Sequence, residues 1–144
     1  MKKINLLVNN FTKSRICKRK IWDQIQIFED LHKCNILSLS ISFIHDEEMT
    51  VLNQKHLKHK GSTDIITFSY DDDLTNLDGE IIICVDEAKR QARQYKVKLI
   101  NELNRLVFHG LLHMIGYKDR SKEEKIRIHQ AEDKLLNELE DHRL

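Results

Sequence analysis

Two periods of hydrophobic residues run along the chain. Between residues 36 and 44 every second position is apolar and serines lie between them, with Leu37, Leu39, Ile41 and Phe43 as the apolar set. This alternation is typical of a half-buried strand. Between residues 14 and 33 the apolar residues instead recur near the helical period, at Ile16, Ile21, Ile25, Phe28 and Leu31. That spacing predicts an amphipathic helix.

The same reading assigns the rest of the chain. Short strands are expected at 4–8, 64–70 and 80–85, the last two around a connection rich in aspartate (Asp71, Asp72, Asp73 and Asp78). Helices are expected at 46–57, 86–95 and 101–115, and a final helix to about Leu139 begins at the capping box Ser121–Glu124. The order β-α-β-α-β-β-α-α-α predicts an α+β fold with α/β-like character, in which a mixed sheet of about four strands packs with about five helices.

Length and composition are those of an ordinary globular domain. The chain has 144 residues, of which 40% are hydrophobic and 33% charged, and it contains no repeat or Gly/Ser-rich linker. We therefore expect residues 1–144 to form a single domain. No apolar run approaches the roughly 20 residues of a membrane span, and the start lacks the apolar core of a signal peptide. Three widely spaced cysteines without a C-x-x-C pair suit free thiols, so we expect a cytoplasmic protein with no membrane contact.

The overall charge gives no argument for nucleic-acid binding. Lysine and arginine number 24 against 23 aspartates and glutamates, for a net charge of +1, whereas nucleic-acid-binding domains are often strongly basic. Basic residues are nevertheless concentrated in the first half, most densely at Lys13, Arg15, Lys18, Arg19 and Lys20. A solvated helix face is the usual meaning of such a run.

The most informative segment is an H-x-x-x-H pair. His109 and His113 are four residues apart in an expected helix, so both side chains lie on one face, about 6 Å apart at Cβ. Gly116 can end that helix in the left-handed conformation and return Asp119 towards the histidines. His109, His113 and Asp119 would then be three metal ligands, which leaves a fourth position for water, as in catalytic sites. The alternative is a pair of ordinary surface or core histidines.

Such a metal ion would favour hydrolysis. A divalent ion lowers the pKa of bound water towards about 7 and polarises a carbonyl or phosphoryl oxygen. In the zinc-protease motif H-E-x-x-H, a glutamate follows the first histidine and acts as the base. Gly110 occupies that position here, which argues against a peptidase.

Several motifs together resemble one known family. Residues 109–117 match H-G-x-L-H-x-x-G-Y, and residues 62–68 are similar to a T-D/N-V-L-S-F segment. Residues 79–83 are similar to G-D/E-I-x-I and are followed by Asp86 and Ala88, while Leu52 and Asn53 match an L-N pair upstream. In this order and spacing, the chain resembles the YbeY-type ribosomal RNA maturation endoribonucleases.

The resemblance implies a small sheet covered by helices, with a metal ion in a cleft beside an edge strand. It implies a metal-dependent, single-strand-specific endoribonuclease that acts in ribosomal RNA maturation, at the ends of the small-subunit RNA, and in ribosome quality control. The implied cofactor is one zinc ion, although other divalent metals would suit the ligands. The implied partners are ribosomal RNA and the small ribosomal subunit.

Two departures from the family pattern bear on the site. Asp119 stands where the family usually has a third histidine, and Lys118 where it has an acidic residue, so the metal identity is left open. Leu57 stands where the resemblance implies an arginine for phosphate contact. Lys55, Lys58 and Lys60 are candidate RNA contacts in its place, together with the basic run in the first helix.

The sequence does not name a general base. Glu102 lies two turns before His109 and is a candidate to orient that ligand through a hydrogen bond, or else is an ordinary glutamate near a helix start. Two other functions are kept as alternatives: a metal-dependent hydrolase of a non-RNA substrate, and a non-catalytic ribosome-assembly factor. The native metal and the oligomeric state are not determined by the sequence.

Overall fold

The computed structural model describes residues 4–57 and 61–142. Within these ranges the elements follow the order expected from the sequence. Their bounds are β1 Asn5–Asn10, α1 Lys18–His32, β2 Asn35–Ile44, α2 Asp46–Leu57, β3 Ile65–Ser69, β4 Asn76–Cys84, α3 Val85–Tyr95, α4 Leu99–Met114 and α5 Lys122–His142.

The strands form one mixed sheet in the order β1-β2-β4-β3. β1 pairs in parallel with β2, and β2 with β4, whereas β3 runs antiparallel to β4. β3 is therefore an edge strand, with one side of its backbone unpaired within the sheet. The α+β fold with a four-stranded mixed sheet and five helices is confirmed in this part of the chain.

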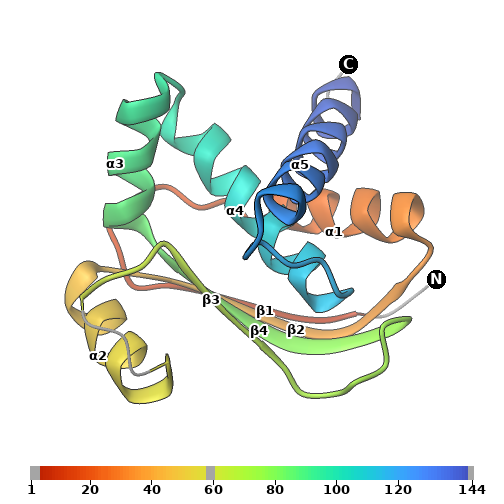
Figure 1. The fold of residues 1–144 in the computed structure, drawn as a ribbon, viewed down its shortest axis with the longest axis horizontal. Helices are drawn as coiled ribbons and strands as arrows, with labels where there is room; N and C mark the ends of the chain where they lie inside the picture. Colours follow the sequence, from red (N-terminus) through yellow and green to blue (C-terminus); the bar gives the residue numbers. More distant parts are fainter. Residues whose placement is uncertain (1–3, 58–60, 143–144) are drawn as a thin grey trace.

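Helices cover the two faces of the sheet unequally. Figure 1 shows α1, α4 and α5 on one side of the sheet and α2 on the other. The larger core lies under α1, α4 and α5 and includes Phe28, Ile81 and Phe108. A smaller cluster packs α2 onto the opposite face around Met49 and Ile82. No helix in the described ranges has the length and apolar character that a membrane crossing requires.

The sequence-based prediction is wrong at one core position of β2. Leu39, Ile41 and Phe43 are buried as the alternation predicts, but Leu37 is exposed and Ile36 is buried in its place. The pairing of β2 with β4 shifts register between Ile36 and Ser38. Because a bulge inserts one residue, it exchanges the two faces of the strand beyond it.

The aspartate-rich connection is a hairpin between β3 and β4. β4 begins at Asn76 rather than at Glu80, because its parallel pairing with β2 continues to that residue, and Asp78 consequently lies within the strand. Asp73 accepts hydrogen bonds from the backbone and side chains of Thr75 and Asn76. Its oxygens are thus used within the turn, as is usual for aspartate at such positions.

Candidate metal centre and cleft

Helix α4 carries both histidines and packs tightly onto the sheet. His109 and Gly110 are buried in this helix, and His113 is partly buried. A Cβ atom built on Gly110 would lie 2.8 Å from Cδ1 of Ile81 and 3.2 Å from Cδ1 of Ile65. A larger side chain would therefore have to displace the side chains of Ile81 and Ile65, which lie between α4 and the sheet. The glycine that replaces a protease base in the sequence is explained here by helix–sheet packing.

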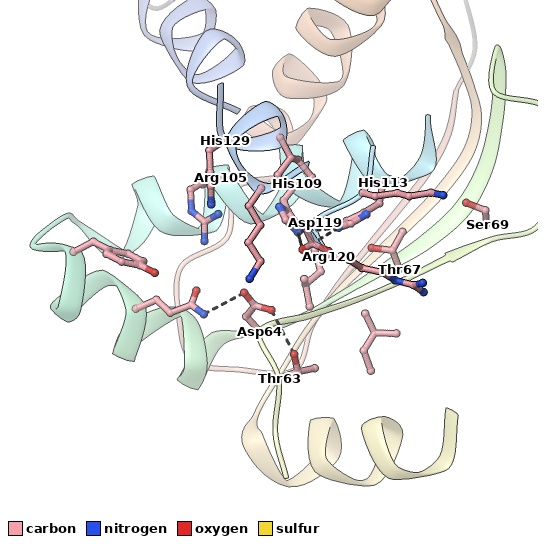
Figure 2. Close-up of a pocket in the computed structure, with 17 residues that line it drawn as sticks. Thr63, Asp64, Thr67, Ser69, Arg105, His109, His113, Asp119, Arg120 and His129 are labelled. Carbon is pink, nitrogen blue, oxygen red and sulfur yellow. Dashed lines mark hydrogen bonds and ion pairs between the residues drawn. The ribbon is translucent and has the colours of Figure 1, made fainter. Parts of the chain in front are cut away.

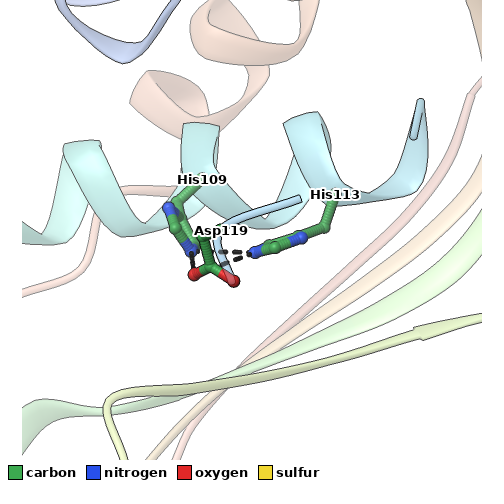
Figure 3. A group of neighbouring side chains, drawn as sticks. All are labelled: His109, His113 and Asp119. Carbon is green, nitrogen blue, oxygen red and sulfur yellow. Dashed lines mark hydrogen bonds and ion pairs between the residues drawn. The ribbon is translucent and has the colours of Figure 1, made fainter. Parts of the chain in front are cut away.

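The end of α4 turns the chain back towards the histidines. Gly116 has a φ of +105°. Its N–H donates to the carbonyl oxygen of His113 at 3.0 Å, and the N–H of Tyr117 donates to that of Leu112 at 3.0 Å. These two bonds form a Schellman motif, which needs a left-handed residue and is best supplied by glycine. The turn brings Asp119 to the face that carries His109 and His113, as Figure 3 shows.

Three potential ligand atoms converge at this point. The Nε2 atoms of His109 and His113 are 2.9 Å apart. Oδ2 of Asp119 lies 3.3 Å from Nε2 of His109 and 3.6 Å from Nε2 of His113. Ligands about 2.0–2.1 Å from a tetrahedral ion lie roughly 3.3 Å from one another. The three distances bracket this value, so the residues fit a single metal ion.

The outer nitrogen of each histidine is already engaged. Nδ1 of His113 donates to the carbonyl oxygen of Tyr117 at 2.9 Å. Nδ1 of His109 hydrogen-bonds to Oε2 of Glu132, which is fully buried. In the neutral form of each ring these acceptors hold the proton on Nδ1, which leaves a lone pair on each Nε2 atom beside the carboxylate of Asp119. Three such acceptors form a site for a cation.

Glu132 is the centre of a buried ion-pair network. Oε1 of Glu132 accepts from Arg105 at 3.0 Å and from Nδ1 of His129 at 3.2 Å. Arg105 also donates its Nε to Glu102 at 3.0 Å. Burial by itself raises the pKa of Glu132, but the hydrogen bond from His109 and the charge and hydrogen bond of Arg105 outweigh it and leave that pKa below its usual value. Glu132 is therefore a carboxylate that holds the ring of His109.

The sequence offered Glu102 either as a candidate to orient His109 or as an ordinary glutamate near a helix start, and the structure brings Glu132 to that ring instead. Glu102 is buried and connects to the network through Arg105, so any influence on His109 is indirect. A signal for Glu132 was present in the sequence. On α5 it falls in the apolar stripe formed by Ile128, Leu135 and Leu139, where a carboxylate requires a buried partner.

The three candidate ligands line a cleft with a volume of about 880 Å³. β3 and α3 line one side of it, and α4, the loop after α4 and the start of α5 line the other, as Figure 2 shows. The exposed fraction of the side chain rises from 10% for His109 to 27% for His113 and 44% for Asp119. The site is therefore fixed on the helix side and accessible from the cleft.

The expected RNA contacts lie elsewhere or outside the described residues. Lys55 is exposed on α2, which packs on the opposite face of the sheet, and it does not line the cleft. Lys58 and Lys60 lie outside the described residues. The exposed basic cluster that ends at Lys20 is also absent from the cleft lining. Their role in RNA contact stays a prediction.

Comparisons with known proteins agree with the motifs in the sequence. The family described as Endoribonuclease YbeY matches residues 7–140. This chain belongs to that family. Proteins named Endoribonuclease YbeY include one from Porphyromonas gingivalis W83 that is 34% identical over 94% of this chain and 89% of its own. Another, from Cytophaga hutchinsonii, is 37% identical over 73% of each chain.

A solved structure shares the fold of this YbeY family member. The solution structure of TM1509 from Thermotoga maritima superimposes with a TM-score of 0.62, covering 95% of this chain and 93% of the other. The two sequences are only 21% identical, so this likeness concerns the fold.

Proposed function

We propose that this protein is a metal-dependent endoribonuclease that acts in the maturation of ribosomal RNA, and that residues 1–144 form one such domain. Membership of the Endoribonuclease YbeY family carries the reaction class. The observation that supports metal dependence is the convergence of two imidazole lone pairs and one carboxylate oxygen in an open cleft.

Each residue of the centre has a distinct role in this proposal. His109 and His113 supply nitrogen ligands whose orientation is maintained by Glu132 and by the carbonyl oxygen of Tyr117. Asp119 supplies an oxygen ligand from the more exposed side. When bound, a divalent ion would lower the pKa of water towards about 7 and withdraw charge from a phosphoryl oxygen. The protein holds the ligand set in place before substrate arrives, so little reorganisation is needed.

The cleft supports a single-stranded polynucleotide as substrate. It is open along the edge strand β3 and is lined mainly by polar side chains, including the hydroxyls of Thr63, Thr67 and Ser69. Single strands expose phosphates and unstacked bases that such a groove can contact. We propose the ends of small-subunit ribosomal RNA as the target and the small ribosomal subunit as the partner.

Zinc is the proposed ion. Imidazole nitrogens suit zinc, and two histidines with one carboxylate are a known catalytic zinc set. The oxygen ligand from Asp119 also suits manganese or magnesium, so the choice is tested by measuring the metal content of the purified protein. A non-zinc ion at one equivalent would leave the ligand assignment in place and change the cofactor.

The direct test is cleavage of single-stranded RNAs that carry the ends of a small-subunit rRNA precursor. We expect the metal-loaded protein to cut these RNAs, a chelator to stop the reaction and added zinc to restore it. Casein serves as the control substrate and should remain intact. Cleavage of casein but not RNA would favour the non-RNA hydrolase. RNA binding without cleavage at full metal content would favour an assembly factor.

A further inference from the structure

Three basic side chains line the cleft close to the proposed metal ligands. Lys118 and Arg120 flank Asp119 on the loop after α4, and Lys125 lies in the first turns of α5. All three are exposed. Across residues 4–57 and 61–142, the side chains of these three residues form no ion pair with a carboxylate. Asp119, which lies between two of them in the chain, pairs with the histidines.

Two other arginines, Arg105 on α4 and Arg90 on α3, differ because carboxylates already neutralise them. Arg105, which also lines the cleft, pairs with both Glu102 and Glu132. Arg90 on α3 donates to Asp46 and Glu87. An arginine with two carboxylate partners has few donors left for a ligand, whereas the guanidinium of Arg120 has no partner within residues 4–57 and 61–142.

The start of α5 does not itself supply the anion-binding groups. The N–H of Glu124 donates to Oγ of Ser121 at 3.1 Å, and the N–H of Ser121 donates to the carboxylate of Glu124 at 2.8 Å. This capping box occupies amides that could otherwise bind an anion. Lys118 lies near enough to Glu124 to contribute, after the hydrogen bonds from Ser121, to lowering the pKa of that carboxyl. Arg120 and Lys125 are thus the cations most available to a ligand.

The opposite side of the cleft compensates this positive charge only in part. It contributes one carboxylate, Asp64, which accepts a hydrogen bond from Gln91 at 3.1 Å, and the lining residues of β3 are apolar or hydroxyl-bearing. Figure 2 shows Arg120 extending from the loop over the cleft, on the side where Thr67 lies. A protein with almost no net charge therefore has a locally basic surface beside its metal site.

We propose that Arg120 and Lys125 bind backbone phosphates of the RNA strand next to the centre formed by His109, His113 and Asp119. This inference rests on the proposed function and names the side chains that position its substrate. Arg120 follows the ligand Asp119 on the same loop, and we assign to it the phosphate nearer the metal site. Its planar guanidinium can contact two phosphate oxygens at once, whereas Lys125 contributes a point charge.

The test is the salt dependence of RNA binding. A fluorescent single-stranded 2′-O-methyl RNA is titrated with the purified protein at several salt concentrations, and a gel checks that the probe stays intact. Each phosphate contact to a single strand contributes about 0.7 to the slope of log K against log salt. We expect Arg120→Gln and Lys125→Gln each to reduce the slope by about 0.7. We expect Arg120→Lys to keep the slope with weaker binding, because it keeps the charge and loses the planar fork.

Matched controls remove the same charge outside the cleft. Arg93→Gln on α3 and Lys122→Gln at the start of α5 change exposed residues that do not line it, and both should leave the slope unchanged. Unchanged slopes in Arg120→Gln and Lys125→Gln, or equal losses in the controls, overturn the assignment. If the slopes change as expected but metal-loaded protein never cuts RNA, the phosphate contacts stand and the nuclease proposal fails. If it cuts RNA while the slopes stay constant, only the phosphate assignment fails.

Discussion

Two groups of three side chains bring potential metal ligands within 4.8 Å of one another in the described part of the chain. One is His109, His113 and Asp119 beside the cleft, and the other is formed by Asp46, Cys84 and Asp86. By proximity alone the two are equivalent. They differ in what the ligand atoms are already bonded to.

The second group is occupied by its own hydrogen-bond donors. Both oxygens of Asp46 accept from Arg90, at 2.7 and 2.9 Å. Asp86 accepts the backbone N–H of Asp46 at 2.8 Å and lies 3.2 Å from Nδ1 of His45. Burial raises the pKa of the Cys84 thiol, which keeps its proton and hydrogen-bonds to Asp46 at 3.3 Å. The group is an ion-pair network that joins α2, β4 and α3.

At the cleft the hydrogen-bond partners are acceptors that lie behind the ligand atoms, rather than donors in front of them. Glu132 and the carbonyl oxygen of Tyr117 accept hydrogen bonds from the Nδ1 atoms of His109 and His113, so the Nε2 atoms of the neutral rings have lone pairs to share. A metal site therefore depends on unoccupied lone pairs as well as on distance.

Among the changes considered, loss of His113 should have the largest effect on metal binding. We expect His113→Ala to lose its bound metal and RNA cleavage while retaining the fold, because the side chain is partly exposed and adds little to the core. Asp86→Asn in the other group is the control and should keep a full metal content. Elemental analysis of both purified variants measures this. Equal metal content in His113→Ala and the unmodified protein would contradict the ligand assignment.

Glu132→Gln should weaken metal binding by about 10–100-fold, the usual cost of losing a carboxylate that orients a ligand histidine. The matched change Glu102→Gln should have a smaller effect, because Glu102 contacts Arg105 and not His109. Competition with a fluorescent zinc chelator gives both affinities, and thermal unfolding checks that each variant folds. A larger loss of metal affinity in Glu102→Gln than in Glu132→Gln would contradict the role of Glu132 in orienting His109.

Asp119→His should retain zinc at least as tightly and bind manganese less well. An imidazole replaces the carboxylate oxygen, and nitrogen ligands favour zinc whereas oxygen ligands favour manganese and magnesium. Competition between the two metals, followed by elemental analysis, tests the change, and Asp119→Ala provides the comparison without a ligand. Complete loss of metal from Asp119→His would show that this position does not ligate the ion.

Arg90→Gln in the occupied group should have the smallest effect. The hydrogen bond from Arg90 lowers the pKa of Asp46 to about 2. Because that pKa lies below the ordinary value of about 3.9, the pair stabilises the fold above about pH 4 and ceases to do so as the pH falls through about 2. The pair is partly exposed, so we expect a loss of less than about 1 kcal/mol at pH 7. Urea unfolding should show a smaller loss of stability at pH 3 than at pH 7. A change in metal content in Arg90→Gln would contradict the conclusion that this group does not bind the metal.

Local features of the centre were accessible from the sequence. The four-residue spacing places His109 and His113 on one helix face, and Gly116 ends α4 as expected. The capping box at Ser121 also forms. The misplacement of Leu37 followed from a bulge, which depends on how β2 pairs with β4 rather than on either strand alone.

The sequence by itself determined the order of the elements, the shared face of the two histidines and the turn that returns Asp119, because each depends on residues close together in the chain. Only the tertiary structure decided that Glu132, 23 residues after His109, accepts the hydrogen bond from its Nδ1 atom. It also decided that Arg90 pairs with Asp46, while the guanidinium of Arg120 pairs with no carboxylate among the described residues. Which donors and acceptors are satisfied depends on how helices pack on one another and on the sheet. Spacing along the chain does not encode that packing.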